Sequence, residues 1–264
     1  TMFESTKRPE GWVEALNQCD AVIVPATFLI EIFREAGVTA PLHVVPLGIS
    51  EEFMHYTPRT KPTSNEPFTF LTIGDRGRRK GWVEACTAFI RAFGDDPCYR
   101  LIIKARQFPF GIQNSNVTLI QQDMTNEELA DLYKLAHVMV FPSRGEGLGF
   151  PPREFVATGG LSLVTDWGGL RDELPQWALP IPYTLEPAWC DDAKWHGKLG
   201  EWALPNVDAL AQLMKHVANY YDAYESFRVM SAGYMLTHRW DVFASRVFSI
   251  WRNVLEVKYA RNNG

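Results

Sequence analysis

The chain has 264 residues, of which 46% are hydrophobic and 22% are charged, as expected for a soluble globular protein with one large domain or two modest ones. Its net charge of −5 argues against a general nucleic-acid-binding surface, and its four widely spaced cysteines favour neither a zinc site nor a disulfide framework. The longest apolar stretch, residues 21–33, is too short and too often interrupted to span a bilayer. We therefore expect a cytoplasmic protein with no nucleic-acid partner.

The N-terminal part of the chain shows a strand–helix–strand pattern. Residues 20–26 (DAVIVPA) are typical of a buried strand, residues 27–37 of a helix closed by a glycine, and residues 42–50 of a short strand that runs into a turn. Residues 56–67 are polar and rich in Pro, Thr and Ser, so we expect a surface loop near a domain boundary.

From residue 68 onward, short β-rich runs alternate with amphipathic helical runs. The strands are predicted at residues 68–74, 99–105, 116–121, 137–142 and 161–165, and the helices at residues 81–93, 125–136 and 152–159. This alternation predicts an α/β fold with a parallel sheet and helices on both faces. Ligands of such sheets bind at the carboxyl ends of the strands.

Three turns at those strand ends carry polar or glycine-rich sequences, namely GDRGRRKG (74–81), SRGEGLGFPP (143–152) and TDWGGLRDEL (165–174). The first follows Gly74 with four cations, and cations at the entry to a helix act together with its N–H groups on phosphate. These cations are Arg76, Arg78, Arg79 and Lys80. A basic run is equally typical of a solvated surface, and the glycine-rich loop on a neighbouring strand favours the phosphate interpretation.

The second turn predicts a phosphate cradle. Gly147 and Gly149 allow close backbone approach, and Pro151 or Pro152 is expected at the first position of a helix, so that free N–H groups face an anion. The turns match neither the dinucleotide fingerprint nor the P-loop motif. The sequence therefore supports neither a Rossmann dehydrogenase nor a P-loop NTPase.

These motifs resemble those of retaining glycosyltransferases of the GT-B fold, specifically glycosyltransferase family 4. The stretch PSRGEGLGFPPREFVATGG is similar to the Glu-x7-Glu motif of that family, with Glu146 and Glu154 as its two acids. The stretches IGDRGRRKGW, TNEELADLYKLAHVMVFPS and GGLRDEL are similar to other motifs of the donor domain, in the same order. CDAVIVPATFLIEIFREAG and VVPLGIS resemble the last elements of the acceptor domain and the crossing between domains.

The resemblance implies a role for each motif residue. Glu154 is expected to accept hydrogen bonds from ribose hydroxyls and Glu146 to orient the transferred sugar. Arg79 and Lys80 are expected to bind the diphosphate in place of a metal ion, and Glu146, Arg79 and Lys80 form the expected catalytic set. The remaining donor-binding residues are expected to be Gly74, Arg76, Gly147, Leu148, Gly149 and Phe150. Which arginine of residues 76 to 79 contacts phosphate stays open, because Asp75 follows Gly74 where many family members have an arginine.

The resemblance also implies a domain organisation. Residues 1–48 are expected to be a remnant of the acceptor domain, residues 49–238 the Rossmann-like donor-binding domain, and residues 239–264 a helix that packs back on the acceptor domain. A whole GT-B enzyme has a larger N-terminal acceptor domain. We therefore interpret the chain as a fragment of a longer enzyme, with a naturally shortened form as the alternative.

The predicted function is transfer of a hexose-type sugar with retention of configuration. The donor is expected to be a UDP-sugar or a GDP-sugar, with no further cofactor, and the acceptor a glycan, a lipid-linked molecule or a protein. A lipid-linked acceptor would place the protein peripherally at the cytoplasmic face of a membrane. Two alternatives are a nucleotide-sugar binding module without activity of its own and a nucleotide-sugar epimerase on the same fold.

Overall fold

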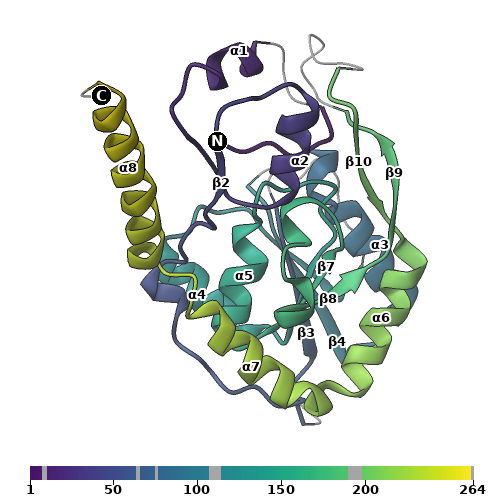
Figure 1. The fold of residues 1–264 in the computed structure, drawn as a ribbon. Helices are drawn as coiled ribbons and strands as arrows, with labels where there is room; N and C mark the ends of the chain where they lie inside the picture. The colour runs from purple at the N-terminus through teal and green to yellow at the C-terminus, as the bar shows by residue number, and fades with distance from the viewer. Residues whose placement is uncertain (8–10, 64–65, 75–76, 107–113, 190–197, 263–264) are drawn as a thin grey trace.

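The structure is a computed structural model that describes residues 1–7, 11–63, 66–74, 77–106, 114–189 and 198–262 (Figure 1). Its centre is a parallel sheet of six strands in the order β5-β4-β3-β6-β7-β8. The strands are β3 (Phe68–Ile73), β4 (Tyr99–Lys104), β5 (Val117–Ile120), β6 (Val138–Phe141), β7 (Leu161–Thr165) and β8 (Ala178–Ile181). The strand order reverses between β3 and β6, so the sheet has its topological switch point between these two strands.

Helices cover both faces of this sheet. On one face, α3 (Trp82–Phe93) and α6 (Val207–Asn219) form a core with the strands that includes Phe70 and Phe89. The other face carries α4 (Asn126–Leu135), α5 (Phe150–Ala157) and α7 (Glu225–Met235). The predicted α/β class and the predicted strands and helices are confirmed.

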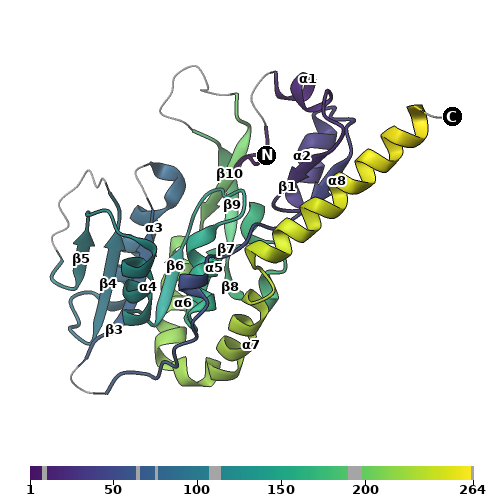
Figure 2. The same cartoon turned by 90° about the vertical axis from the view of Figure 1, so that its left-hand side faces the viewer.

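The N-terminal unit of the chain is small. It contains α1 (Trp12–Leu16), β1 (Val22–Val24), α2 (Phe28–Glu35) and β2 (Leu42–Val44), with β1 and β2 paired in parallel. A separate apolar cluster holds it together, built mainly from Val24, Leu29 and Phe33. Figures 1 and 2 show this unit beyond the end of the sheet at which the polar turns lie.

Two segments of the chain that leave the sheet run side by side. The first passes through Ile49 and the 3₁₀ helix η1 (Glu51–Phe53), and the second precedes α8 (Trp240–Asn262). The N–H of Ile49 donates to the carbonyl of His238 at 2.7 Å, and Ile49 pairs with Arg239 in parallel. From there α8 extends along the N-terminal unit, as Figure 2 shows, and Lys258 Nζ lies 2.6 Å from Asp20 Oδ2.

An antiparallel arm projects from the sheet toward the N-terminal unit. Its strands are β9 (Tyr183–Pro187) and β10 (Glu201–Pro205), and sequence analysis had predicted neither. The first residues of the chain lie along this arm, because the N–H of Thr6 donates to the carbonyl of Glu201 at 2.9 Å. The arm thus connects the polar turns with the N terminus of the chain.

The loop expected at residues 56–67 is only partly a surface loop. The described part forms no helix or strand, as predicted, but Arg59 is 8% exposed. Its guanidinium donates to the carbonyls of Thr158 at 2.8 Å and Tyr133 at 3.0 Å, so the loop is attached to α4 and α5. Among the helices of the described chain, none combines the length and apolar character needed to cross a membrane.

Candidate functional site

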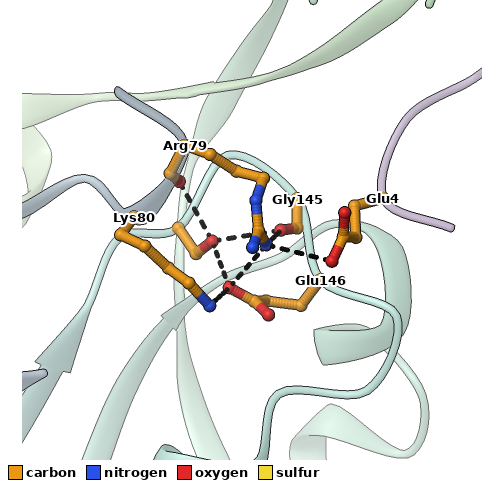
Figure 3. Close-up of polar contacts among 6 residues, drawn as sticks. Glu4, Arg79, Lys80, Gly145 and Glu146 are labelled. Carbon is orange, nitrogen blue, oxygen red and sulfur yellow. Dashed lines mark hydrogen bonds and ion pairs between the residues drawn. The ribbon is translucent and has the colours of Figure 1, made fainter. Parts of the chain in front are cut away.

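The turns after β3 and β6 meet at the topological switch point, where sheets of this kind bind ligands (Figure 3). The turn after β3 forms the 3₁₀ helix η2 (Arg78–Lys80) before α3. The carbonyl of Arg79 accepts from the N–H of Arg144 at 2.7 Å, and the Arg79 guanidinium donates to the carbonyl of Gly145 at 2.6 Å. The two turns therefore form one continuous surface.

Glu146 is the centre of a polar cluster in this surface. Its side chain is 8% exposed, and its Oε1 lies 2.7 Å from Lys80 Nζ and 3.1 Å from Arg79 Nη1. The hydroxyl of Ser143 donates to the same oxygen at 2.7 Å. Burial alone would raise the pKa of Glu146, but the charges of Lys80 and Arg79 and these hydrogen bonds lower it below its usual value. Glu146 is therefore an ionised, buried carboxylate.

Two glycines make this arrangement possible. A Cβ at Gly74 would lie 2.6 Å from the Cβ of Lys80, so only a glycine at the end of β3 leaves room for the lysine. Gly81 has a positive φ of 67° and begins α3, and a Cβ there would collide with the carbonyl of Pro142. Lys80 is thus fixed between the end of β3 and the turn after β6.

The glycine-rich loop leads into α5 one residue earlier than expected. Gly149, with φ of 84°, is the N-cap, and the helix begins at Phe150, which puts Pro151 at the second helical position. The prediction that a proline starts the helix is therefore wrong by one residue, because the left-handed glycine already begins the turn. Pro151 and Pro152 carry no N–H, so the backbone donors available here belong to Phe150 and the loop before it.

Arg153 connects the glycine-rich loop to the turn after β7. It is 3% exposed, and its guanidinium donates to the carbonyl of Leu148 at 3.3 Å and to that of Gly169 at 3.0 Å. The N–H of Gly169 in turn donates to the carbonyl of Glu146 at 2.9 Å. Burial lowers the pKa of Arg153 to about 10, and its guanidinium stacks 4.2 Å from the ring centre of Trp177. All three polar turns are therefore in contact at one sheet edge, as predicted.

Glu154 has a different partner from Glu146. The hydroxyl of Tyr133 on α4 donates to Glu154 Oε2 at 2.9 Å. Burial raises the pKa of Glu154 to about 7, although this hydrogen bond lowers it. The two acids of the predicted motif therefore differ in charge state near neutral pH, since Glu146 is held ionised by cations and Glu154 titrates.

Arg144, which was not predicted as a site residue, holds the arm against the site. Its guanidinium is 2% exposed and lies 2.6 Å from Glu84 on α3 and 2.7 Å from Glu186 on β9. Burial would lower the pKa of Arg144, but the hydrogen bonds with the two glutamates raise it. Nothing in the local sequence distinguishes this arginine from the exposed ones, because its acidic partners are distant in the chain.

The first residues of the chain, which were not predicted to contribute, cover the loop of residues 145–147. Glu4 Oε1 lies 3.5 Å from Arg79 Nη1, as Figure 3 shows. A Cβ at Gly145 would collide with the carbonyl of Glu4, and one at Gly147 would lie 2.8 Å from the sulfur of Met2. No motif marks residues 1–7, so only the fold brings them to the site.

The structure brings together the predicted Glu146, Arg79 and Lys80, with Gly74 beside Lys80. The other predicted loop residues lie in the same turn, and these are Gly147, Leu148, Gly149 and Phe150. Arg76 lies outside the described residues, as do residues 107–113 and 190–197. Within the described ranges, no group of three or more His, Cys, Asp or Glu side chains is arranged to hold a metal ion.

Comparison by sequence finds no matching family model and no matching protein of established function. Comparison by structure finds sucrose-phosphate synthase from Thermosynechococcus elongatus, with a TM-score of 0.68 and 18% identity over 93% of this chain and 61% of that one. A glycosyltransferase from Rickettsia africae matches with a TM-score of 0.70 and 13% identity, over 96% of this chain and 69% of that one. The pneumococcal O-GlcNAc transferase, solved with UDP and GlcNAc, matches with a TM-score of 0.62 and 16% identity, over 92% of this chain and 47% of that one.

This chain matches between 47% and 69% of the length of these three proteins. At identities of 18% or less, the likeness concerns the fold. The strand order, the helices on both faces and these superpositions together show that the chain has the Rossmann-like α/β fold of GT-B glycosyltransferases.

Proposed function

We propose that this chain is the donor-binding part of a retaining GT-B glycosyltransferase of the family 4 type. It transfers a hexose-type sugar from a UDP-sugar or GDP-sugar to a glycan, lipid-linked or protein acceptor. The observation that supports this most directly is the buried Glu146 with Lys80 and Arg79 at the switch point of the sheet. A purely structural role gives no reason to hold two cations against a buried carboxylate at a ligand-binding edge.

In this proposal the diphosphate binds beside Lys80 and Arg79, facing the N–H groups of the glycine-rich loop and the start of α5. Glu154 accepts hydrogen bonds from the ribose hydroxyls, and Glu146 accepts hydrogen bonds from hydroxyls of the transferred sugar. The two carboxylates lie on either side of the anion and do not bind it. Without a donor, Glu146 neutralises the two cations that the diphosphate would otherwise neutralise.

The reaction follows from where charge develops. As the bond between the anomeric carbon and the phosphate oxygen breaks, the sugar gains positive charge and the leaving diphosphate gains negative charge. Lys80 and Arg79 stabilise the diphosphate, because they are already fixed in place before the reaction. The acceptor hydroxyl then bonds to the anomeric carbon from the same face, and its proton passes to the leaving phosphate.

Because Arg79 and Lys80 replace a metal ion in this proposal, the activity should not depend on one. Sugar transfer or donor hydrolysis, measured by release of the nucleoside diphosphate, should be equal in buffer and in excess EDTA. Adding Mg²⁺ or Mn²⁺ afterwards should not increase it. A rate that falls in EDTA and returns with either metal contradicts this part of the proposal.

Calorimetric titration of UDP and GDP into the purified chain tests donor binding. We expect one of the two to bind, and Lys80→Ala to weaken that binding about 10- to 100-fold, since a charge-assisted contact to phosphate is lost. Lys134→Ala is the matched control, because Lys134 pairs with Asp131 on the exposed face of α4. Failure of the wild-type chain to bind either nucleotide, or equal binding by Lys80→Ala, overturns the proposal.

We further propose the domain roles that the resemblance implies, with residues 1–48 as the end of an acceptor domain and residues 239–264 as a helix that packs on it. Two observations support this. The N-terminal unit has an apolar cluster of its own, and α8 lies along it with the ion pair between Lys258 and Asp20. On α8, Phe243, Val247 and Val254 are half-buried.

A further inference from the structure

A pocket lies beside the candidate donor site, between the first residues of the chain, η2 and the arm. Its volume is about 220 Å³. The side chains that give it its character are Phe3, Glu4, Arg78, Arg79, Trp189 and Trp202. Arg79 also belongs to the cluster around Glu146, and three of the six are aromatic. The lining of the pocket therefore differs chemically from that of the donor site.

One wall of this pocket is aromatic and held in place. Trp202 on β10 is 5% exposed, and its indole N–H donates to Glu186 at 3.0 Å. The same carboxylate oxygen accepts from the buried guanidinium of Arg144 at 2.7 Å, so the wall is fixed to the turn after β6. Trp189, just after β9, is 42% exposed and provides the accessible ring.

Other residues that line the pocket carry charge. The side chains of Glu4 and Arg79 are 39% and 29% exposed, and their closest atoms are 3.5 Å apart. The same Arg79 nitrogen lies 3.1 Å from Glu146. Arg79 therefore belongs to both sites, and a molecule in the pocket lies next to the group that the diphosphate would contact.

We propose that this pocket binds one sugar ring of a carbohydrate acceptor, an inference that rests on the proposed glycosyl transfer. A pyranose ring has apolar C–H faces that pack on an indole, and hydroxyl edges that donate to a carboxylate and accept from a guanidinium. The residues that line the pocket include groups of both kinds. Its volume is below the range of about 300–1,000 Å³ that is usual for drug-sized ligands, which fits a single ring.

The pocket distinguishes this acceptor class from the others. A lipid chain needs a continuous apolar groove, whereas Glu4, Arg78 and Arg79 interrupt this surface. A peptide that binds by adding a strand needs a free strand edge, whereas Glu201 at the start of β10 already bonds with Thr6. Carbohydrate is therefore the acceptor class that the aromatic and charged lining residues together favour.

Ligand-observed NMR with a defined set of sugars tests this inference. The probes are glucose, galactose, N-acetylglucosamine, maltose and lactose, each with the full chain and with or without UDP. We expect at least one to bind, Trp189→Ala and Glu4→Gln each to weaken it at least tenfold, and Trp189→Phe to keep most of the affinity. Trp251→Ala on α8, where the ring is 55% exposed, and Glu14→Gln on α1 are the matched controls.

The two proposals fail in different ways. If no probe binds with or without UDP, or if Trp189→Ala binds like the wild type, the carbohydrate pocket is wrong even when UDP binds well. If a probe binds and is lost in Trp189→Ala while neither nucleotide binds, the pocket stands and the proposed glycosyl transfer is wrong. Titration of UDP into Trp189→Ala is the control for folding. If UDP still binds, the loss of sugar binding comes from the change in the pocket and not from unfolding of the chain.

Discussion

Glu146 keeps its negative charge although its side chain is buried, because two cations and a hydroxyl contact one of its oxygens. A nucleoside diphosphate must compete with this carboxylate for Lys80 and Arg79. The glutamate thus has two effects in the proposed function, since it binds the sugar and also holds the cations before the donor arrives. Substituting it separates these effects.

In Glu146→Gln we expect UDP to bind as tightly as in the wild type or more tightly, because the competing negative charge is gone. Turnover of the matching UDP-sugar should fall about 100-fold, since the hydroxyls of the transferred sugar lose the charged carboxylate to which they donate hydrogen bonds. Calorimetry with UDP and single-turnover hydrolysis of the UDP-sugar measure the two effects. Unchanged hydrolysis in this variant, with the fold intact, removes Glu146 from the site.

Glu154 predicts a pH dependence of donor binding. Its carboxylate form accepts ribose hydroxyls, and burial raises its pKa to about 7, so UDP-sugar affinity should rise between pH 6 and pH 8. Glu154→Gln should show no such rise. A UDP-sugar is the suitable ligand, because the second ionisation of free UDP falls in the same range. An equal pH profile in wild type and Glu154→Gln contradicts the assignment.

The same shift predicts an effect on stability. The folded pKa lies above the usual value of 4.5, so the stability that the protonated group contributes is full below about pH 4.5 and is lost as the pH rises through about 7. Relative to Glu154→Gln, the wild type should therefore lose up to about 3 kcal/mol between pH 4.5 and pH 8. Urea unfolding at several pH values measures this difference.

The sequence predicted the charged residues of the cluster because they stand next to glycines at strand ends. It did not predict Ser143 and Tyr133 as their partners, because a serine or tyrosine beside a strand or in a helix has many possible roles. Glu4 was beyond prediction from sequence for a different reason. It comes from residues with no pattern, and only the path of the chain across residues 145–147 brings it to Arg79.

Among the elements, those with strong periodicity were predicted and those shaped by long-range contacts were not. β8 was not predicted, because Pro180 within it is typical of the end of a strand. The proline is tolerated there because β8 is an edge strand of the sheet. The arm of β9 and β10 depends on Arg144, whose partners lie on α3 and β9. Short amphipathic strands of this kind have no distinctive local pattern.

Arg144→Met tests how much the arm depends on this arginine. Its removal leaves Glu84 and Glu186 without their buried partner, so we expect a loss of about 3–5 kcal/mol in the free energy of unfolding, measured by urea denaturation. Arg91→Met is the matched control, because its pair with Asp208 is exposed, and it should cost at most about 1 kcal/mol. Equal losses in the two variants contradict this account of the arm.

The whole molecule depends on the close contact between its two crossing segments. A Cβ at Gly48 would lie 2.6 Å from the Cα of Trp240, and backbone atoms cannot move aside as a side chain can. In Gly48→Ala we expect the hydrogen bond from Ile49 to His238 to be lost and the protein to be less stable by about 1–3 kcal/mol. Chemical denaturation measures the change.

Gly233→Ala is the matched control for this substitution. Gly233 lies within α7, and a Cβ there meets no atom within 4 Å. Alanine should leave the stability unchanged or raise it by up to about 1 kcal/mol, because it favours helix more than glycine does. If Gly48→Ala is as stable as Gly233→Ala, the crossing segments are not packed as the structure shows.

The contact between the two segments at Ile49 and Arg239 also has a mechanical consequence. A body attached to another at two neighbouring points keeps one easy rotation, about the line through those points, and resists the others. Here the points are Ile49, on the segment between the N-terminal unit and the sheet, and Arg239, on the segment that leads into α8. The N-terminal unit is also attached elsewhere, because the N–H of Thr27 donates to Asp172 and the N–H of Thr6 to the carbonyl of Glu201. Rotation about this axis would therefore have to break those hydrogen bonds.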